Sequence, residues 1–284
     1  MKNNIPEFLY NMLINQYGEN ISNKIIKGYS QKRPVTLRAN TLKTNISYIK
    51  NFFDNLGFKY KEVSWYTDAL IMENISIDQI KNLEIYKSGE IYLQSLSSMI
   101  PPIILSPQEN ENILDMASAP GGKATQMLAL SSNKAFITAC EKNKIRAERL
   151  KYNINLQSAN RINVMVKDSR TLDDFLSFDK ILLDAPCSGL GVMKSKPEIK
   201  YHDSSVMDTI IPLQAKLLDN AYYLLKNNGK MVYSTCTINK KENEQMIKKF
   251  LEKYPDMKIV EERKILPFVY DSDGFYMCKL EKGK

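Results

Sequence analysis

The chain has 284 residues, of which 43% are hydrophobic and 25% charged; these values are average for globular proteins and argue against disorder or a fibrous fold. Lysine and arginine number 40 against 32 acidic residues, and the net charge of +8 favours a polyanionic partner. The four cysteines lie far apart and His202 is the only histidine, so we expect no metal site and no histidine-based triad.

The N-terminal segment, Met1 to Glu7, lacks the apolar run of a secretory signal. The most apolar later stretch, Met99 to Leu105, is too short to span a bilayer and contains two adjacent prolines. We therefore expect a cytoplasmic protein without a membrane span, and we expect it to be a monomer.

A basic segment runs from Asn20 to Phe53, with seven lysines and arginines and no Asp or Glu. Tyr29 and Tyr48 lie among these charges. Basic side chains neutralise phosphates, and tyrosine rings can stack on unpaired bases for about 1–3 kcal/mol each. The segment favours contact with single-stranded nucleic acid, although a solvated basic face has the same pattern. The candidates for phosphate contact here are Arg38, Asn40 and Lys43.

The first 80 residues have the pattern of a small α+β platform. The predicted elements are two short helices, a strand at Val35–Ala39, a helix at Ile46–Leu56, and strands at Phe58–Val63 and Ala69–Met72. No Gly/Ser/Pro-rich linker follows. We place the boundary near residue 90, between an N-terminal α+β RNA-binding region, 1–90, and a catalytic domain, 91–284.

After residue 110 apolar strands alternate with helices. The predicted strands are Ile113–Ala117, Ala135–Cys140, Ile162–Val166, Ile181–Asp184 and Met231–Ser234. The predicted helices are one near Gln126, Lys144–Leu156, Ile211–Leu225 and Lys241–Tyr254. This alternation predicts an α/β fold with a doubly wound, mostly parallel sheet, and such sheets bind ligands at the carboxyl ends of their strands.

The first of these strands ends in a glycine-containing loop, Asp115 to Lys123. Gly121 and Gly122 allow the backbone to approach a ligand closely, but the loop is neither a GxGxxG fingerprint nor a Walker phosphate loop. Glu141 ends the second strand, where a carboxylate can accept both hydroxyls of a ribose. Asp168 follows the third strand and could accept an adenine amino group. Either acid could equally be a helix cap or a solvated loop residue.

Two cysteines follow the fourth and fifth strands, in Asp184-Ala-Pro-Cys187 and in Ser234-Thr-Cys236. A single free cysteine is more often an inert core residue, but two at the ligand-binding edge favour chemistry. Transfer of a methyl group to an exocyclic amine would favour an aromatic residue where Cys187 stands. Carbon 5 of a pyrimidine, in contrast, becomes nucleophilic only after a thiolate adds to carbon 6.

Several further motifs accompany the two cysteines. They are Arg38-Ala-Asn40-Thr-Leu-Lys43, Tyr92 to Ser98, Asp115 to Lys123, Asp184 to Gly191, Lys196-Pro-Glu-Ile-Lys200, Ser234 to Thr237 with Glu242-Asn-Glu244, and Asp273 to Tyr276. From about Pro34 to Lys282 the chain resembles the RsmB/Nop/Sun family of S-adenosylmethionine-dependent RNA cytosine-5 methyltransferases. The resemblance implies a Rossmann-like class I methyltransferase fold with a small N-terminal α+β RNA-binding domain.

The resemblance also implies roles for individual residues. It implies that the methionine part of S-adenosylmethionine is wrapped by Ala117, Ser118, Ala119, Pro120, Gly121, Gly122 and Lys123. It further implies that Glu141 holds the ribose, that Asp168 holds the adenine, and that Asp184 lies beside cofactor and cytosine. Cys236 is implied as the nucleophile and Cys187 as an aid to product release. Ala117 and Ser118 depart from the usual Cys-Ala of the family.

The mechanism that we expect begins with attack of the Cys236 thiolate on C6 of a flipped cytosine. Asp184, kept protonated or hydrogen-bonded, donates toward the ring, and Lys123 is the candidate cation that favours the thiolate. Lys196 is expected to contact the RNA. Ribosomal and transfer RNA both remain open as substrates. The alternatives are an exocyclic-amine methyltransferase and a catalytically silent RNA-binding or ribosome-assembly factor.

Overall fold

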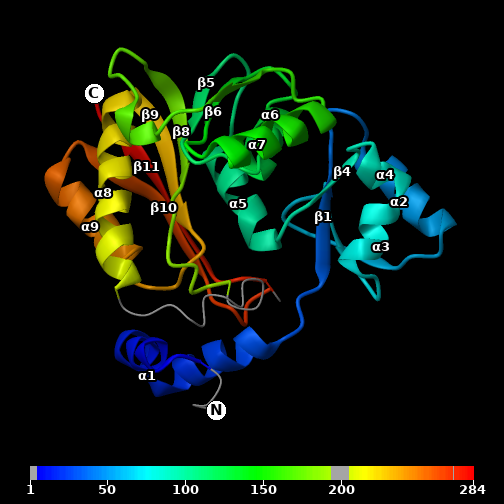
Figure 1. Ribbon diagram of the computed structural model, residues 1–284, viewed down its shortest axis with the longest axis horizontal. Helices are drawn as coiled ribbons and strands as arrows, with labels where there is room; N and C mark the ends of the chain where they lie inside the picture. The colour runs from blue at the N-terminus through cyan, green and yellow to red at the C-terminus, as the bar shows by residue number, and fades with distance from the viewer. Residues whose placement is uncertain (1–4, 193–204, 271) are drawn as a thin grey trace. The chain divides into compact units, whose positions relative to one another are not determined.

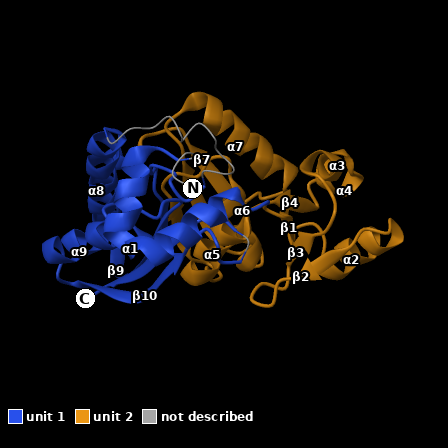
Figure 2. Cartoon of the chain, turned by 90° about the horizontal axis from the view of Figure 1, so that it is seen from below, with its two compact units in different colours: residues 1–32, 169–284 blue, residues 33–168 orange. Residues whose placement is uncertain are grey.

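A computed structural model describes residues 5–192, 205–270 and 272–284 of the protein (Figure 1). The chain divides into two compact units, one formed by Met1–Lys32 with Ser169–Lys284 and the other by Arg33–Asp168 (Figure 2). We call them unit 1 and unit 2. They do not follow the boundary that we placed near residue 90, and that boundary stays a prediction.

Unit 2 begins with a four-stranded antiparallel sheet in the order β2-β3-β1-β4. Its strands are β1 (Val35–Ala39), β2 (Tyr60–Glu62), β3 (Ala69–Met72) and β4 (Ile91–Leu93). Its helices are α2 (Ile46–Asn55), α3 (Ile77–Asn82) and α4 (Glu84–Lys87). The side chain of Asn45 caps α2, and a capping box of Ser76 and Gln79 begins α3. Buried side chains of the sheet and helices, among them Leu37 and Phe53, form the core.

The rest of unit 2 has the strand and helix alternation that the sequence predicts. Strands β5 (Asn112–Asp115), β6 (Phe136–Cys140) and β7 (Ile162–Met165) pair in parallel, and helices α6 (Gly122–Leu130) and α7 (Lys144–Leu156) connect them. Helix α5 (Leu96–Leu105), which the sequence did not predict, precedes β5. The carboxyl ends of β5 and β6 therefore lie at one edge, where their loops carry the predicted cofactor residues.

The small sheet is joined to the end of α7 by close backbone contacts within unit 2. The amide of Asn40 donates to the carbonyl oxygens of Gly89 and Gln157, at 2.8 and 2.9 Å. Gly89 has a positive φ of 74°, and a Cβ there would lie 2.2 Å from the carbonyl oxygen of Leu156. Only glycine fits at this position, because any side chain would separate the two backbones.

Unit 1 contains two parallel strands followed by two antiparallel ones, in the order β10-β11-β9-β8. The strands are β8 (Phe178–Asp184), β9 (Leu225–Thr235), β10 (Met257–Ile265) and β11 (Phe275–Lys282). The helices are α8 (Val206–Leu224) and α9 (Glu244–Lys253), which run beside these strands, with a short 3-10 turn at Ser169–Thr171 (Figure 1). The sequence did not predict β10 and β11.

Helix α1 (Glu7–Ser30) lies in unit 1 and not with the small sheet. The helical geometry breaks at Gly18, where φ is 72°, so α1 corresponds to the two short helices that the sequence predicts. Its buried residues, including Leu9, Leu13 and Ile25, pack with Leu190. The N-terminal helices therefore cover the loops that follow β8 and β9.

The predicted fold class is confirmed, because strands β5 to β11 belong to a seven-stranded sheet whose pairs are parallel except at β10 and β11. A small α+β domain accompanies it. Within the described residues, no helix is both long and apolar enough to cross a membrane.

Candidate active site

Unit 1 brings the two predicted cysteines together. Asp184 and Ser234 stand opposite each other at the ends of the parallel strands β8 and β9, and each strand continues into a loop that carries one cysteine. The Sγ atoms of Cys187 and Cys236 are 3.1 Å apart, within hydrogen-bond reach, and neither cysteine forms a disulfide bond. Both residues are half-buried, whereas the other cysteines are buried. The pair is thus accessible in a way that the core cysteines are not.

The surroundings of Cys187 favour its neutral thiol. The hydrogen bond with Cys236 raises the pKa of Cys187 well above its usual value, and burial and the negative charges of Cys236 and Glu242 act in the same direction. At neutral pH Cys187 therefore carries a proton that it can share with the neighbouring sulfur. This state suits a group that moves protons and not one that attacks carbon.

Asp184 lies at the end of β8, three residues before Cys187. Its Oδ1 accepts a hydrogen bond from the Ser234 hydroxyl at 2.8 Å, and the backbone N–H of Ala185 donates to the carbonyl of Ser234 at the same distance. These bonds tie the ends of β8 and β9 to each other. A half-buried carboxyl at the end of the strand that leads to Cys187 can orient a polar ring substituent.

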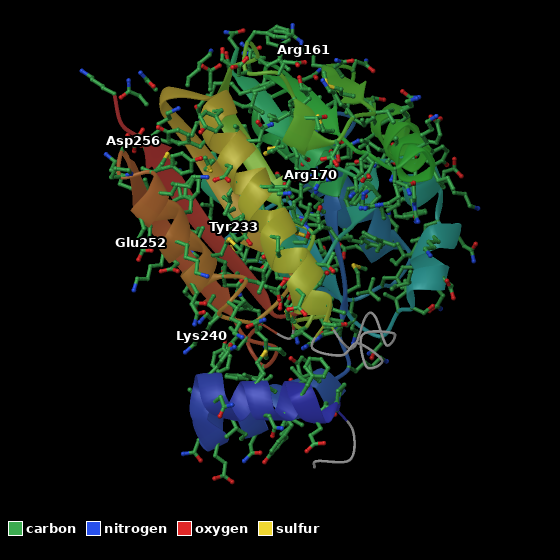
Figure 3. All side chains as sticks on the ribbon, turned by 60° about the vertical axis from the view of Figure 1, so that its left-hand side comes forward. Arg161, Arg170, Tyr233, Lys240, Glu252 and Asp256 are labelled. Carbon is green, nitrogen blue, oxygen red and sulfur yellow. The ribbon has the colours of Figure 1, made fainter. Side chains whose placement is uncertain are left out.

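Helix α1 forms hydrogen bonds with the two loops that carry the cysteines. The hydroxyl of Tyr29 donates to the carbonyl of Leu190, and that of Tyr17 donates to the carbonyl of Ile238, both at 2.5 Å. Lys240, labelled in Figure 3, donates to the carbonyl of Gln16 at 2.6 Å. The prediction that Tyr29 stacks on a base is wrong, because its ring is buried in the core of unit 1.

The two glycines of the loop in unit 2 pack closely against other side chains of the unit, and the predicted approach of this loop to a ligand stays a prediction. Gly121 has a φ of 105°, and a Cβ there would lie 2.9 Å from Leu150. A Cβ at Gly122 would lie 2.9 Å from the ring of Tyr92. The Ser118 hydroxyl is buried and has no hydrogen-bond partner in the part of the chain that is described. A buried, unsatisfied hydroxyl in a loop with two adjacent glycines fits a polar ligand.

Glu141, at the end of β6, is 4% exposed. One carboxylate oxygen accepts from the N–H of Asn143 at 2.9 Å, and the other lies 3.4 Å from Arg146. Arg146 also donates to the carbonyl of Ala119, and Asn153 donates to that of Pro120. The acid is thus tied to the glycine loop through Arg146, and each oxygen retains a lone pair for a hydroxyl donor. These residues fit the ribose and methionine parts of the expected cofactor.

The remaining predicted cofactor residues follow the strands of unit 2 as the sequence indicates. Asp168 is half-buried and follows β7, and Ala117 lies two residues after β5. Lys123 lies in the first turn of α6, and its proposed effect on the Cys236 thiol stays a prediction. In the described part of the chain, no three His, Cys, Asp or Glu side chains form a group that could hold a metal ion.

Arg38 and Asn40 do not lie where phosphate contact requires them. Both are 0% exposed. The Arg38 guanidinium donates to Gln94 at 3.0 Å, to the carbonyl of Gly122 at 3.0 Å and to the Thr125 hydroxyl at 2.8 Å. The prediction of RNA contact by these two residues is wrong, because both side chains are completely buried and bond to α6 and to the end of α7 inside unit 2. Lys43 is exposed, and Lys196 lies outside the described residues with Lys194, Lys200 and His202.

Replacement of Arg38 is therefore expected to affect stability and not RNA binding. Arg38→Met leaves three buried acceptors without their donor, and we expect the free energy of unfolding to fall by about 2–4 kcal/mol. Lys43→Met is the control, with an expected change within about 0.5 kcal/mol. Urea unfolding of both variants measures the effect. Weaker RNA binding by Arg38→Met at unchanged stability would contradict the assignment.

Comparison with known proteins decides the family. The family model for 16S rRNA methyltransferase RsmB/F matches residues 102–281, which is more than half of the chain. The chain belongs to this family. The ferredoxin-like domain of RsmF/B-like methyltransferases matches residues 5–77. The resemblance drawn from the sequence motifs is confirmed, and with it the S-adenosylmethionine-dependent type of the family.

Relatives in the RsmB/F family support this membership. The chain is 32% identical over 272 residues to ribosomal RNA small subunit methyltransferase F of Shewanella loihica, covering 87% of this chain and 56% of the relative. It is 33% identical over 306 residues to the 25S rRNA (cytosine-C(5))-methyltransferase nop2 of Schizosaccharomyces pombe, covering 97% and 50%. The chain thus spans about half the length of these curated relatives.

A solved structure agrees with the fold. A methyltransferase homolog protein from Pyrococcus horikoshii is 27% identical, with a TM-score of 0.87, and the match covers 98% of this chain and 95% of that one. The RsmB/F fold therefore extends over nearly the whole chain. The sequence motifs included Glu242 without giving it a role, and they did not indicate Tyr17 or Gln214, because the contacts of these residues join distant parts of the chain.

Proposed function

We propose that the protein is an S-adenosylmethionine-dependent RNA cytosine-5 methyltransferase that acts through a covalent Cys236–C6 bond. The observation that supports this most directly is the approach of the two thiols, since the Sγ atoms of Cys187 and Cys236 are 3.1 Å apart. Methyl transfer to an amine needs no sulfur nucleophile, whereas transfer to carbon 5 of a pyrimidine does. The name of the Schizosaccharomyces relative also specifies cytosine C5.

The proposed reaction begins at Cys236. Its thiolate adds to C6 of a flipped cytosine, and the electron pair of the C5–C6 bond moves toward N3, where Asp184 orients a proton. The ring then has nucleophilic character at C5. Once C5 carries the methyl group, a base or water removes the C5 proton, the C6–S bond breaks with its electron pair going to sulfur, and the proton at N3 returns to Asp184, which restores the aromatic ring. Cys187 supplies a proton to the departing Cys236 sulfur.

The cofactor, when bound, supplies a methyl group activated by a sulfonium. We propose that the backbone of Ala117 to Lys123 holds its methionine part, that Glu141 accepts both ribose hydroxyls and that Asp168 accepts the adenine amino group. The buried Ser118 hydroxyl and the Glu141 carboxylate support this placement, because each offers hydrogen-bonding capacity inside the loop. Lys123 is proposed as the cation that favours the Cys236 thiolate.

The substrate class that we propose is RNA, ribosomal or transfer, and the names of the two curated relatives favour ribosomal RNA. Lys43 and Lys196 are the proposed phosphate contacts that remain after Arg38 and Asn40 are assigned to the core. A cytoplasmic location and a monomeric state stay expectations from the sequence.

Two measurements test the proposal. Incubation with RNA and labelled S-adenosylmethionine, followed by nucleoside digestion, is expected to yield 5-methylcytidine. N4-methylcytidine or N6-methyladenosine would instead indicate an exocyclic-amine enzyme. Calorimetric titration with the cofactor is expected to show binding below about 1 mM, at the upper end of usual substrate affinities. A failure to bind would favour a silent RNA-binding factor.

A further inference from the structure

Glu242, between β9 and α9, has a carboxylate that lies completely inside unit 1, with 0% exposure. Its Oε2 accepts from the backbone N–H of Ser188 at 2.9 Å, and its Oε1 accepts from the Ser188 hydroxyl at 2.5 Å. Ser188 directly follows Cys187 in the chain. The Glu242 carboxylate therefore accepts hydrogen bonds from both the backbone and the side chain of Ser188, the residue next to Cys187.

The same carboxylate also reaches the other cysteine loop. Its Oε1 accepts from the hydroxyl of Thr237 at 3.3 Å and from the amide of Asn239 at 3.3 Å. Thr237 directly follows Cys236. The hydroxyls of Ser188 and Thr237 are in addition 2.9 Å apart. The two residues that follow the two cysteines are thus joined to each other and to one acid.

A glutamine of α8 completes this network. The amide of Gln214 donates to Glu242 Oε2 at 3.1 Å and to the carbonyl of Pro186, the residue before Cys187, at 2.9 Å. The hydroxyl of Tyr233 donates to the backbone carbonyl of Glu242 at 2.7 Å. A buried carboxylate with this number of donors is held in one orientation, because loss of any bond leaves a polar group without water.

We propose that Glu242 is a positioning residue that sets the Cys187–Cys236 separation by fixing the residue after each cysteine. The inference rests on the proposed function, since it assigns Glu242 to the methyl-transfer site of that function. Strand pairing brings the ends of β8 and β9 together only as far as Asp184 and Ser234. Beyond that point a backbone hydrogen bond joins the two loops, from the N–H of Gly191 to the carbonyl of Cys236 at 3.0 Å, and the Glu242 carboxylate adds side-chain contacts to both loops.

The charge of Glu242 supports a second effect on the same pair. A negative charge disfavours a nearby thiolate, and Glu242 is one of the groups that raise the pKa of Cys187. Cys187 also faces Cys236, and its environment includes the backbone of Gly189, which acts in the opposite direction. Glu242 thereby helps to keep Cys187 protonated.

Glu242→Gln tests the proposal in the full-length protein. The substitution keeps the shape but exchanges one acceptor oxygen for an NH2 group, which cannot accept from Ser188 or Gln214. We expect kcat to fall about ten- to a hundredfold, while KM for RNA and Kd for S-adenosylmethionine stay within about twofold. Asp219→Asn is the matched control, because Asp219 on α8 accepts from Tyr254 and pairs with Lys253. Its kcat is expected to be unchanged.

A readout independent of activity distinguishes failure of this inference from failure of the proposed function. In a Cys236→Ala background, the rate of iodoacetamide alkylation of Cys187 is followed against pH by mass spectrometry. Adding Glu242→Gln is expected to move this profile to lower pH, because the pKa of Cys187 falls when the charge is removed. Ser188→Ala, which retains the charge, is expected to lower kcat without moving the profile.

Three results would overturn the inference. They are an unchanged kcat in Glu242→Gln, a loss of kcat no larger than that of Asp219→Asn, or an alkylation profile that does not move. If Glu242→Gln does not fold, Ser188→Ala and Thr237→Val carry the test, since each removes one bond and leaves the acid in place. Unchanged kcat in both would then overturn it. Alkylation remains measurable even if no methylated RNA is formed.

Discussion

Cys236→Ala is expected to abolish methyl transfer while the fold and the binding of S-adenosylmethionine are retained. Without the sulfur no bond to C6 forms, and C5 of cytosine stays unreactive toward an alkyl donor. We expect the rate to fall by at least about a thousandfold, as for other nucleophiles removed from enzymes that use covalent catalysis. Single-turnover transfer of a labelled methyl group to RNA measures the effect, and thermal unfolding checks the fold.

Cys278→Ala is the control for this variant. Cys278 lies in β11, is buried, and has a pKa raised by burial to about 12, so it is a core thiol without a nucleophilic role. Its removal is expected to lower the stability by about 1 kcal/mol with little change in the rate of transfer. A Cys236→Ala protein that still forms 5-methylcytidine would show that another group starts the reaction.

Cys187→Ala is expected to accumulate a covalent protein–RNA adduct. The Cys187 thiol lies 3.1 Å from the Cys236 sulfur and is kept protonated by its surroundings, so it can protonate the sulfur as the C6–S bond breaks. Without it this last step slows, and the enzyme stops with the RNA attached. Denaturing gel electrophoresis with labelled RNA measures the adduct, which we expect to form in about one equivalent per enzyme.

The double variant Cys187→Ala with Cys236→Ala is the control, because it lacks the attacking sulfur and is expected to form no adduct. If Cys236→Ala alone traps RNA and Cys187→Ala does not, the two sulfurs have exchanged roles. The distance between the two sulfurs does not distinguish the attacking one, so the two single variants assign the roles directly.

Local sequence patterns predicted most elements near the site. The helix at Lys144–Leu156 has the predicted bounds, as do the strands Val35–Ala39 and Ala69–Met72. These segments have either helical periodicity or short apolar runs that depend on neighbouring residues only. In contrast, β10 and β11 were missed. Most of β10 is exposed and charged, so it lacks the buried alternation from which a strand is recognised.

The predictions of nucleic-acid contact that rested on residue type alone were wrong for the residues that the fold buries. The basic segment from Asn20 to Phe53 has the pattern of a nucleic-acid-binding surface. Three of its residues are nevertheless buried, namely Arg38, Asn40 and Tyr29. Their side-chain donors bind backbone or side-chain acceptors at least 49 positions away in the chain. Charge and aromatic character are properties of the residue, whereas exposure is a property of the packed chain.

The amino-acid sequence by itself determined the chemistry: a cysteine after each of two strands, an acid after the first, and a glycine loop with a following carboxylate. These features follow from residue identity and from the rule that parallel strands end at one edge. Only the tertiary structure decided the 3.1 Å approach of the sulfurs and the contacts of Glu242 and α1 that hold it. Such contacts join residues up to 224 positions apart, and no local pattern encodes them.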